Sequence, residues 1–120
     1  MKHSHIIAID DNQTNLILLE KLLNPHYQII GFTNPYKAWE YIRVHEIDMI
    51  LSDMVMPGMN GIDILKKVKA FNPDIPFIII SAYDKKTYIN QAFKSGVYRY
   101  LVKPLNPLEL IGLIDETLKT

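Results

Sequence analysis

The sequence predicts a doubly wound α/β domain, a five-stranded parallel sheet with five helices distributed over both of its faces. Three observations predict this fold. Short apolar runs alternate five times along the chain with segments whose apolar residues recur at helical spacing. The run at 76–81 is apolar on both sides of its pleat, which is typical of a parallel strand covered on each face. Right-handed crossovers between successive strands then place the helices in two layers.

Composition limits the class of protein. A chain of 120 residues can bury one core but not two, so we expect a single domain over 1–120. Lys and Arg total 13, as do Asp and Glu, and this balance argues against direct nucleic-acid binding. The absence of cysteine excludes a disulfide scaffold and a thiolate metal site. The apolar run near the N-terminus is too short for a signal peptide or a membrane span, so we expect a cytoplasmic protein without membrane association.

Proline and asparagine mark the helix boundaries in the first half of the chain. Pro25 ends a helix whose leucines recur at helical spacing. Asn34 and Pro35 form an N-cap followed by proline at the first helical position, which begins the second helix. The elements expected here are strands at 6–9, 28–32 and 48–53, a helix at 12–24 and a helix after 34.

The second half of the chain repeats this alternation. Apolar residues at three-residue intervals predict a third helix, which begins after Asn60 and ends at 72–74. The fourth helix has a thin apolar face and is expected to stop with Gly96 as its C-cap. Asn106 and Glu109 predict an N-cap and a capping box for the last helix. The elements expected here are strands at 76–81 and 98–102 and helices at 84–95 and from 106 to about 119.

Five polar residues lie at the carboxyl ends of four predicted strands. Asp10 and Asp11 follow the first strand, and Asp53, Ser81 and Lys103 stand at the ends of the third, fourth and fifth. Because parallel strands point the same way, these side chains converge at the edge where open α/β sheets bind ligands. Taken singly, the acidic pair would favour a helix cap, Ser81 a turn and Lys103 a loop, whereas Asp53 alone favours neither reading. Their co-occurrence at one edge favours a functional site instead.

The chemistry of these five residues indicates phosphoryl transfer. Three neighbouring carboxylates repel one another, and Mg²⁺, or Mn²⁺ in its place, compensates their charge. The Lys103 ammonium and the Ser81 hydroxyl can each hold a phosphoryl oxygen. An oxygen of Asp53 can then attack phosphorus in line. We therefore expect an acyl phosphate on Asp53.

With these residues in view, the chain resembles the receiver domain of bacterial two-component response regulators over essentially its whole length. The resemblance rests on Asp10-Asp11, on the stretch from Asp53 to Gly61, on Ser81-Ala82 and on the stretch from Tyr100 to Pro104. It implies a flavodoxin-like strand order of 2-1-3-4-5. It also implies that Asp53 takes its phosphoryl group from a phosphohistidine of a sensor histidine kinase or a histidine phosphotransfer protein.

The resemblance also assigns roles to single residues. Asp11 and Asp53 would bind Mg²⁺ directly together with the backbone carbonyl of Val55, and Asp10 would act mainly through a metal-bound water. Lys103 and Ser81 would hold the phosphoryl oxygens, although the family commonly has threonine where this chain has Ser81.

A second set of roles concerns the output. Ser81 and Tyr100 would form a switch that controls an output domain or partner. Val55 and Tyr83 would tune how fast water attacks the phosphoaspartate, and since neither is suited to orient a water, we predict a long-lived phosphoryl state. Homodimerisation is expected through the fourth helix, the fifth strand and the fifth helix, a face that carries Tyr88, Lys94, Tyr98, Arg99 and Tyr100.

We therefore expect a signalling module that catalyses its own phosphorylation, not an enzyme that turns over a free substrate. One alternative is a phosphohydrolase that works through an aspartyl phosphate, but such enzymes typically carry a second Asp at the position of Val55. Another is an interaction domain independent of phosphorylation, which the intact set of Asp53, Lys103 and the acidic pair disfavours. The cognate kinase, the output and any continuation past Thr120 stay open.

Overall fold

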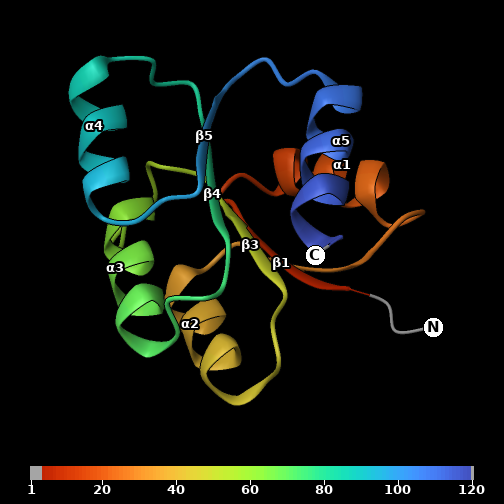
Figure 1. The fold of residues 1–120 in the computed structure, drawn as a ribbon, viewed down its shortest axis with the longest axis horizontal. Coiled ribbons are helices and arrows are strands. Elements are labelled where there is room, and N and C mark those ends of the chain that lie inside the picture. Colours follow the sequence, from red (N-terminus) through yellow and green to blue (C-terminus); the bar gives the residue numbers. More distant parts are fainter. Residues whose placement is uncertain (1–3, 120) are drawn as a thin grey trace.

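Figure 1 shows the protein as a computed structural model that describes residues 4–119. Strands and helices alternate as the sequence predicts, and all pairings within the five-stranded sheet are parallel, in the order β2-β1-β3-β4-β5. The elements are β1 (His5–Ile9), α1 (Gln13–Leu23), β2 (Gln28–Phe32), α2 (Pro35–Val44), β3 (Met49–Ser52), α3 (Gly61–Phe71), β4 (Phe77–Ser81), α4 (Lys86–Lys94), β5 (Arg99–Val102) and α5 (Pro107–Leu118). The doubly wound fold and its expected strand order are confirmed.

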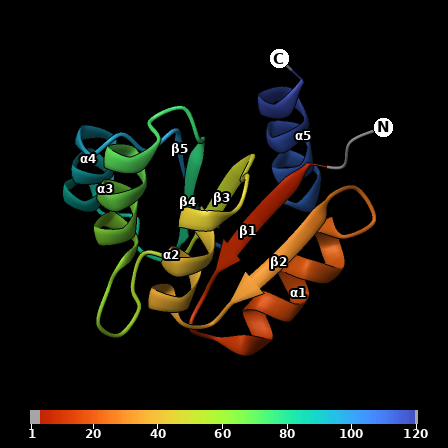
Figure 2. The same cartoon turned by 90° about the horizontal axis from the view of Figure 1, so that it is seen from below.

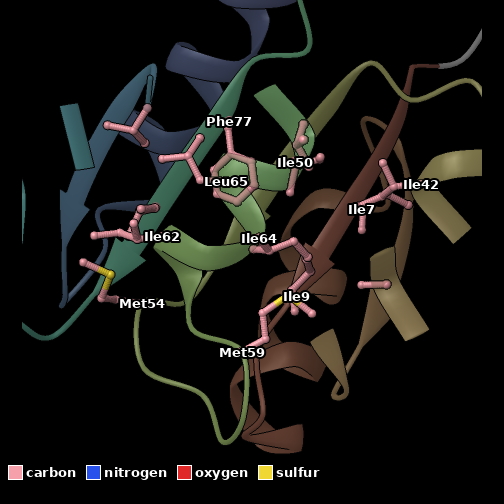
Figure 3. Close-up of a cluster of buried hydrophobic side chains, with 14 of the residues drawn as sticks. Ile7, Ile9, Ile42, Ile50, Met54, Met59, Ile62, Ile64, Leu65 and Phe77 are labelled. Atoms are coloured by element: carbon pink, nitrogen blue, oxygen red, sulfur yellow. The ribbon is translucent and has the colours of Figure 1, made fainter. Parts of the chain in front are cut away.

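Helices cover both faces of the sheet. Figures 1 and 2 show α2, α3 and α4 on one side and α1 and α5 on the other. Successive residues of a strand face opposite sides, so Ile7 and Ile9 of β1 pack toward α2 and α3 while Ile6 and Ala8 pack toward α1 and α5. Figure 3 shows the first of these two cores, in which Ile50, Phe77 and the side chains of α3 interdigitate.

Burial on both faces of the sheet fixes the register between neighbouring strands. Every residue of β3 and β4 is buried, and burying one Ile or Leu side chain stabilises the fold by about 1.5–3 kcal/mol. Slipping a strand by one residue would move all of its apolar side chains to the wrong core. The register therefore holds the carboxyl ends of β1, β3, β4 and β5 at one edge, where Ile9 pairs with Ser52 and Ser81 with Val102.

Asparagine caps four helices, as the sequence indicates for most of them. The side chains of Asn12, Asn34, Asn60 and Asn106 accept hydrogen bonds from backbone amides in the first turns of α1, α2, α3 and α5. The capping box predicted at α5 is wrong, because within the described chain Glu109 makes no return bond to the Asn106 amide. The box occurs at α3, where the shorter Asp63 side chain accepts from the Asn60 amide at 3.0 Å.

Helix α4 is shorter than predicted and weakly anchored. Its N-cap is Lys85, which has no side-chain acceptor to offer and makes no capping bond in the structure. The helix ends at Lys94 with Ser95 as the C-cap, and Gly96 follows with φ of 101°, a conformation that favours glycine. The C-cap prediction for Gly96 was thus off by one residue. Ala92 is the buried residue of the helix, which confirms the thin apolar face.

Between residues 4 and 119 the longest helix has 12 residues, and none is both long and apolar enough to cross a membrane.

Candidate functional site

Backbone hydrogen bonds place the functional side chains at the edge of the sheet. The Asp53 amide donates to the Ile9 carbonyl at 2.8 Å, which extends the β1–β3 ladder by one residue and brings Asp53 beside Asp10. The Lys103 amide donates to the Ser81 carbonyl at 2.9 Å and does the same for the β4–β5 ladder. The four strand ends predicted to meet do meet.

A close backbone approach then turns the chain away from Asp53. The Gly61 amide donates to the Met54 carbonyl at 2.8 Å. A Cβ at Gly61 would lie 2.5 Å from the backbone oxygen of Asp53, so glycine is required where α3 begins under this loop. The loop between Asp53 and α3 is therefore packed tightly against the strand that carries Asp53.

Three carboxylates form the centre of the site. Asp10, Asp11 and Asp53 each offer an oxygen, and these oxygens lie within 4.8 Å of one another. Asp10 is buried and Asp11 is exposed. The Asp10 carboxylate also accepts a hydrogen bond from the Asn12 amide at 2.9 Å, so it helps to begin α1 as well.

Lys103 brings the opposing positive charge. Its Nζ atom lies 3.6 Å from Oδ2 of Asp10 and 4.0 Å from Oδ1 of Asp53. These distances are long for hydrogen-bonded ion pairs, and the ammonium stands between two carboxylates without being bound tightly by either. It is thus positioned to meet an anion that enters the site.

The charge around Asp53 is not balanced. Burial raises the pKa of its carboxyl above the ordinary value, and the charges of Asp10 and Asp11 raise it further. The Lys103 ammonium and a hydrogen bond of 2.8 Å from the Met54 amide to Asp53 Oδ1 oppose this effect. The ionised carboxylate is therefore disfavoured overall and would gain from an additional cation.

The donor set fits Mg²⁺. Its donors are hard carboxylate oxygens, the ligands that Mg²⁺ prefers, and a cation would relieve the repulsion that raises the Asp53 pKa. The structure places Val55 two residues beyond Asp53 with its side chain half exposed. Ligation by the Val55 carbonyl stays a prediction.

Ser81 and Tyr100 are linked through the backbone of Tyr83. Ser81 is fully buried, and its Oγ accepts a hydrogen bond from the Tyr83 amide at 3.0 Å. The Tyr100 hydroxyl donates to the Tyr83 carbonyl at 2.8 Å. Burial raises the pKa of the Tyr100 phenol, and the negative charge of Asp53 adds to the effect, so this ring lies within electrostatic reach of the site.

An apolar groove opens beside the carboxylates, and sequence reasoning did not predict it. It encloses about 520 Å³ between α1 and the segment that follows β5. Asp10, Asp53 and Lys103 lie at its polar end, and its walls are formed by leucines, isoleucine and prolines (Leu18, Leu19, Leu22, Leu51, Ile80, Pro104, Leu105 and Pro107). The available signal in the sequence was the number of leucines in α1 (Leu16, Leu18, Leu19, Leu22 and Leu23), which is more than one face of a helix can bury.

A family model described as the response regulator receiver domain matches residues 6–115. Among curated proteins, the transcriptional regulatory protein ZraR of Klebsiella oxytoca is 37% identical over 114 residues, which is 94% of this chain and 26% of that protein. The chain spans about a quarter of the length of the first curated relatives that it matches.

Solved structures share the fold. The BeF3-activated DrrB receiver domain superposes with a TM-score of 0.93 at 18% identity, covering 99% of this chain and 100% of that one. The receiver domain of the sensor histidine kinase PA1611 from Pseudomonas aeruginosa PAO1 superposes with a TM-score of 0.89 at 20% identity, over 99% and 100% of the two chains. That structure is described with a magnesium ion coordinated in its active site cleft.

Proposed function

The chain belongs to the family of response regulator receiver domains, and on that premise we propose that it is a phosphoacceptor switch with Asp53 as the acceptor. The observation that carries the proposal is the cluster of three carboxylate oxygens within 4.8 Å of one another, faced by the Lys103 ammonium. Such a cluster is poised for a divalent cation and a phosphoryl dianion, and it is costly without them.

Asp53 is the nucleophile in this proposal. One of its carboxylate oxygens attacks the phosphorus of a phosphohistidine on the donor protein, and the phosphorus–nitrogen bond breaks with its electron pair left on the imidazole. The product is an acyl phosphate on Asp53. Lys103 moves from its position between Asp10 and Asp53 to pair with a phosphoryl oxygen, and Ser81 donates its hydroxyl proton to another.

Mg²⁺ would be held directly by Asp11, Asp53 and the backbone carbonyl of Val55, with Asp10 acting mainly through a metal-bound water, and it would supply positive charge against the phosphoryl oxygens. Mn²⁺ has the same preference for oxygen ligands and would substitute. The Asp10 side chain keeps its bond to the Asn12 amide, which holds the carboxylate in place for this role.

The apolar groove favours a protein as the donor. Its walls are mostly apolar, and Leu18 of α1 is 61% exposed at its rim. An exposed apolar surface beside a site marks a surface that a partner covers. A sensor histidine kinase or a histidine phosphotransfer protein would lay an apolar surface here while its phosphohistidine reaches Asp53.

Phosphorylation would be transmitted through Ser81 and Tyr100. When Ser81 turns its hydroxyl to the phosphoryl group, it releases the Tyr83 amide. Tyr100 binds the carbonyl of the same residue, so a movement of Tyr83 also moves the partner of Tyr100. The shift reaches the face formed by α4, β5 and α5, which would control an output domain or partner or form a homodimer. The exposed Tyr88, Tyr98 and Arg99 are suited to such an interface.

The family is a signalling domain, and we propose that this chain, too, turns over no free substrate. Neither Val55 nor Tyr83 carries a group well suited to orient a water for in-line attack, and Tyr83 is bulky, which supports a long-lived phosphoryl state. The curated relatives are named as transcriptional regulators, but the balanced charge of this stretch supports our expectation that it does not itself contact nucleic acid.

The proposal is tested by intact mass spectrometry after incubation with acetyl phosphate and Mg²⁺. We expect the mass of one phosphoryl group on the wild-type chain, none on Asp53→Asn and none in the presence of EDTA. Normal phosphorylation of Asp53→Asn would overturn the assignment of the acceptor, and normal phosphorylation in EDTA would overturn the role of the metal.

A further inference from the structure

We infer that Tyr88, in the first turn of α4, is a positioning residue that holds the Tyr83 ring beside the phosphorylated aspartate and so slows its hydrolysis. The inference rests on the proposed function. It concerns a residue outside the acidic cluster and explains how a half-exposed side chain on a loop can act as a fixed barrier to water.

The two rings are in direct contact. The centroids of Tyr83 and Tyr88 lie 5.7 Å apart with an interplanar angle of 62°, an edge-on arrangement that aromatic pairs prefer. Both side chains are partly exposed, Tyr83 at 45% and Tyr88 at 40%. A ring with that much exposure would otherwise sample several rotamers, so the contact is what restricts it.

Two hydrogen bonds hold the backbone of Tyr83 in the structure, whereas no hydrogen bond holds its ring among the bonds of the described residues. Its amide donates to Ser81 at 3.0 Å and its carbonyl accepts from Tyr100 at 2.8 Å. When phosphorylation draws Ser81 away from the amide, the Tyr100 bond still holds the carbonyl, and the side-chain torsions decide where the ring lies. Among the described residues, Tyr88 is the ring that Tyr83 contacts.

Tyr88 also lies near Val55, the second residue predicted to tune hydrolysis. It lines a hollow of about 290 Å³ together with Met54, Val55 and Met56 of the loop that follows Asp53. Val55 and Tyr83 follow the ends of the neighbouring parallel strands β3 and β4, each two residues beyond a site residue. Tyr88 therefore contacts the Tyr83 ring and also faces the loop that carries Val55.

The step that Tyr88 would slow is hydrolysis of the acyl phosphate. A water oxygen attacks phosphorus on the side opposite the Asp53 oxygen, the bond between that oxygen and phosphorus breaks, and its electron pair returns to the carboxylate. The water proton goes to solvent and inorganic phosphate leaves. An ordered Tyr83 ring reduces the fraction of time in which that approach is open.

The test is the rate at which phosphorylated protein loses its phosphoryl group, measured by intact mass after removal of acetyl phosphate. The interaction energy of an edge-on aromatic pair corresponds to a rate change of about twofold to tenfold, so Tyr88→Ala should accelerate loss of the phosphoryl group by that factor. Tyr88→Phe, which keeps the ring, should have the wild-type lifetime. Phe93→Ala, at a similarly exposed aromatic of the same helix, is the matched control and should have no effect.

A double variant separates positioning from a general loosening of α4. Tyr83→Ala should accelerate hydrolysis, and adding Tyr88→Ala should accelerate it no further, because the residue being positioned is already gone. Additive effects, or an unchanged lifetime in Tyr88→Ala, would overturn the inference and leave Asp53 as the acceptor intact. A chain that never gains a phosphoryl group would overturn both proposals.

Discussion

Replacing Asp53 by asparagine should stabilise the fold when no divalent cation is present. The substitution keeps the shape of the side chain and the oxygen that accepts from the Met54 amide, but it removes a charge. The pKa of Asp53 is raised by burial and by Asp10 and Asp11, which means that the ionised form is disfavoured in the folded protein. Removing that charge therefore removes an unfavourable contribution.

The distances give the size of the effect. The oxygens of Asp53 lie at most 4.8 Å from those of Asp10 and Asp11. At an effective dielectric constant of about 20, two unit charges at that separation repel by about 3.5 kcal/mol. The attraction between the Lys103 ammonium and Asp53 Oδ1, 4.0 Å apart, offsets about 4 kcal/mol of this repulsion. After allowance for solvent screening of the exposed Asp11, we expect about 1–3 kcal/mol of net stabilisation in Asp53→Asn.

The effect has a defined dependence on pH. A carboxyl whose pKa is higher in the folded state costs no stability below its unfolded value of 3.8, and the cost appears as pH rises from there through the raised folded value. The advantage of Asp53→Asn should thus be larger at pH 7 than at pH 5 and should vanish on acidification below pH 3.8.

The assay is thermal unfolding followed by circular dichroism in EDTA at low ionic strength. The midpoint of Asp53→Asn should exceed that of the wild-type chain by about 4–12 °C, and Mg²⁺ should narrow the gap by binding the wild-type site. Equal midpoints in EDTA, or an advantage that grows as the pH falls, would refute the argument from charge crowding.

Three further predictions address the site and its supports. Lys103→Ala should lower the rate of phosphorylation by acetyl phosphate by about 100-fold or more with an unchanged circular dichroism spectrum, and a rate within threefold of wild type would remove this ammonium from the mechanism. Gly61→Ala should cost about 1–3 kcal/mol in urea unfolding, because its Cβ would lie 2.5 Å from the Asp53 carbonyl oxygen, and unchanged stability would contradict that packing. Tyr100→Phe should weaken the protection of the loop around Tyr83 from amide exchange by about 0.5–1.5 kcal/mol, whereas unaltered exchange would mean that the hydroxyl bond does not hold this loop.

The alternation of strands and helices was predictable because each element carries its own local signal. Apolar runs, leucines at helical spacing and Asn-Pro starts all act within a few residues, so their meaning does not depend on the rest of the chain. The meeting of Asp10, Asp53 and Lys103 was predictable for a different reason. Parallel topology brings strand ends together whatever the details of packing, and the measured separations agree with it.

Other features depend on how side chains from distant elements fit together. To predict the groove beside Asp53, one must know which leucines of α1 stay uncovered by other elements. That depends on where α5 packs, and its first residue, Pro107, lines the groove. The capping box was expected at Glu109 and occurs at Asp63, whose carboxylate accepts from the Asn60 amide at 3.0 Å. The contact between Tyr83 and Tyr88 has no sequence pattern of its own, since one ring lies on a loop and the other on a helix.

The central claim is that Asp53 forms an acyl phosphate, and chemical trapping tests it most directly. The protein would be incubated with acetyl phosphate and Mg²⁺ and then reduced with borohydride, which converts an aspartyl phosphate into homoserine, before peptide mapping. The account predicts homoserine at residue 53 and nowhere else in the chain. Homoserine at another aspartate, or an unreduced Asp53 in protein that carries phosphate, would contradict it.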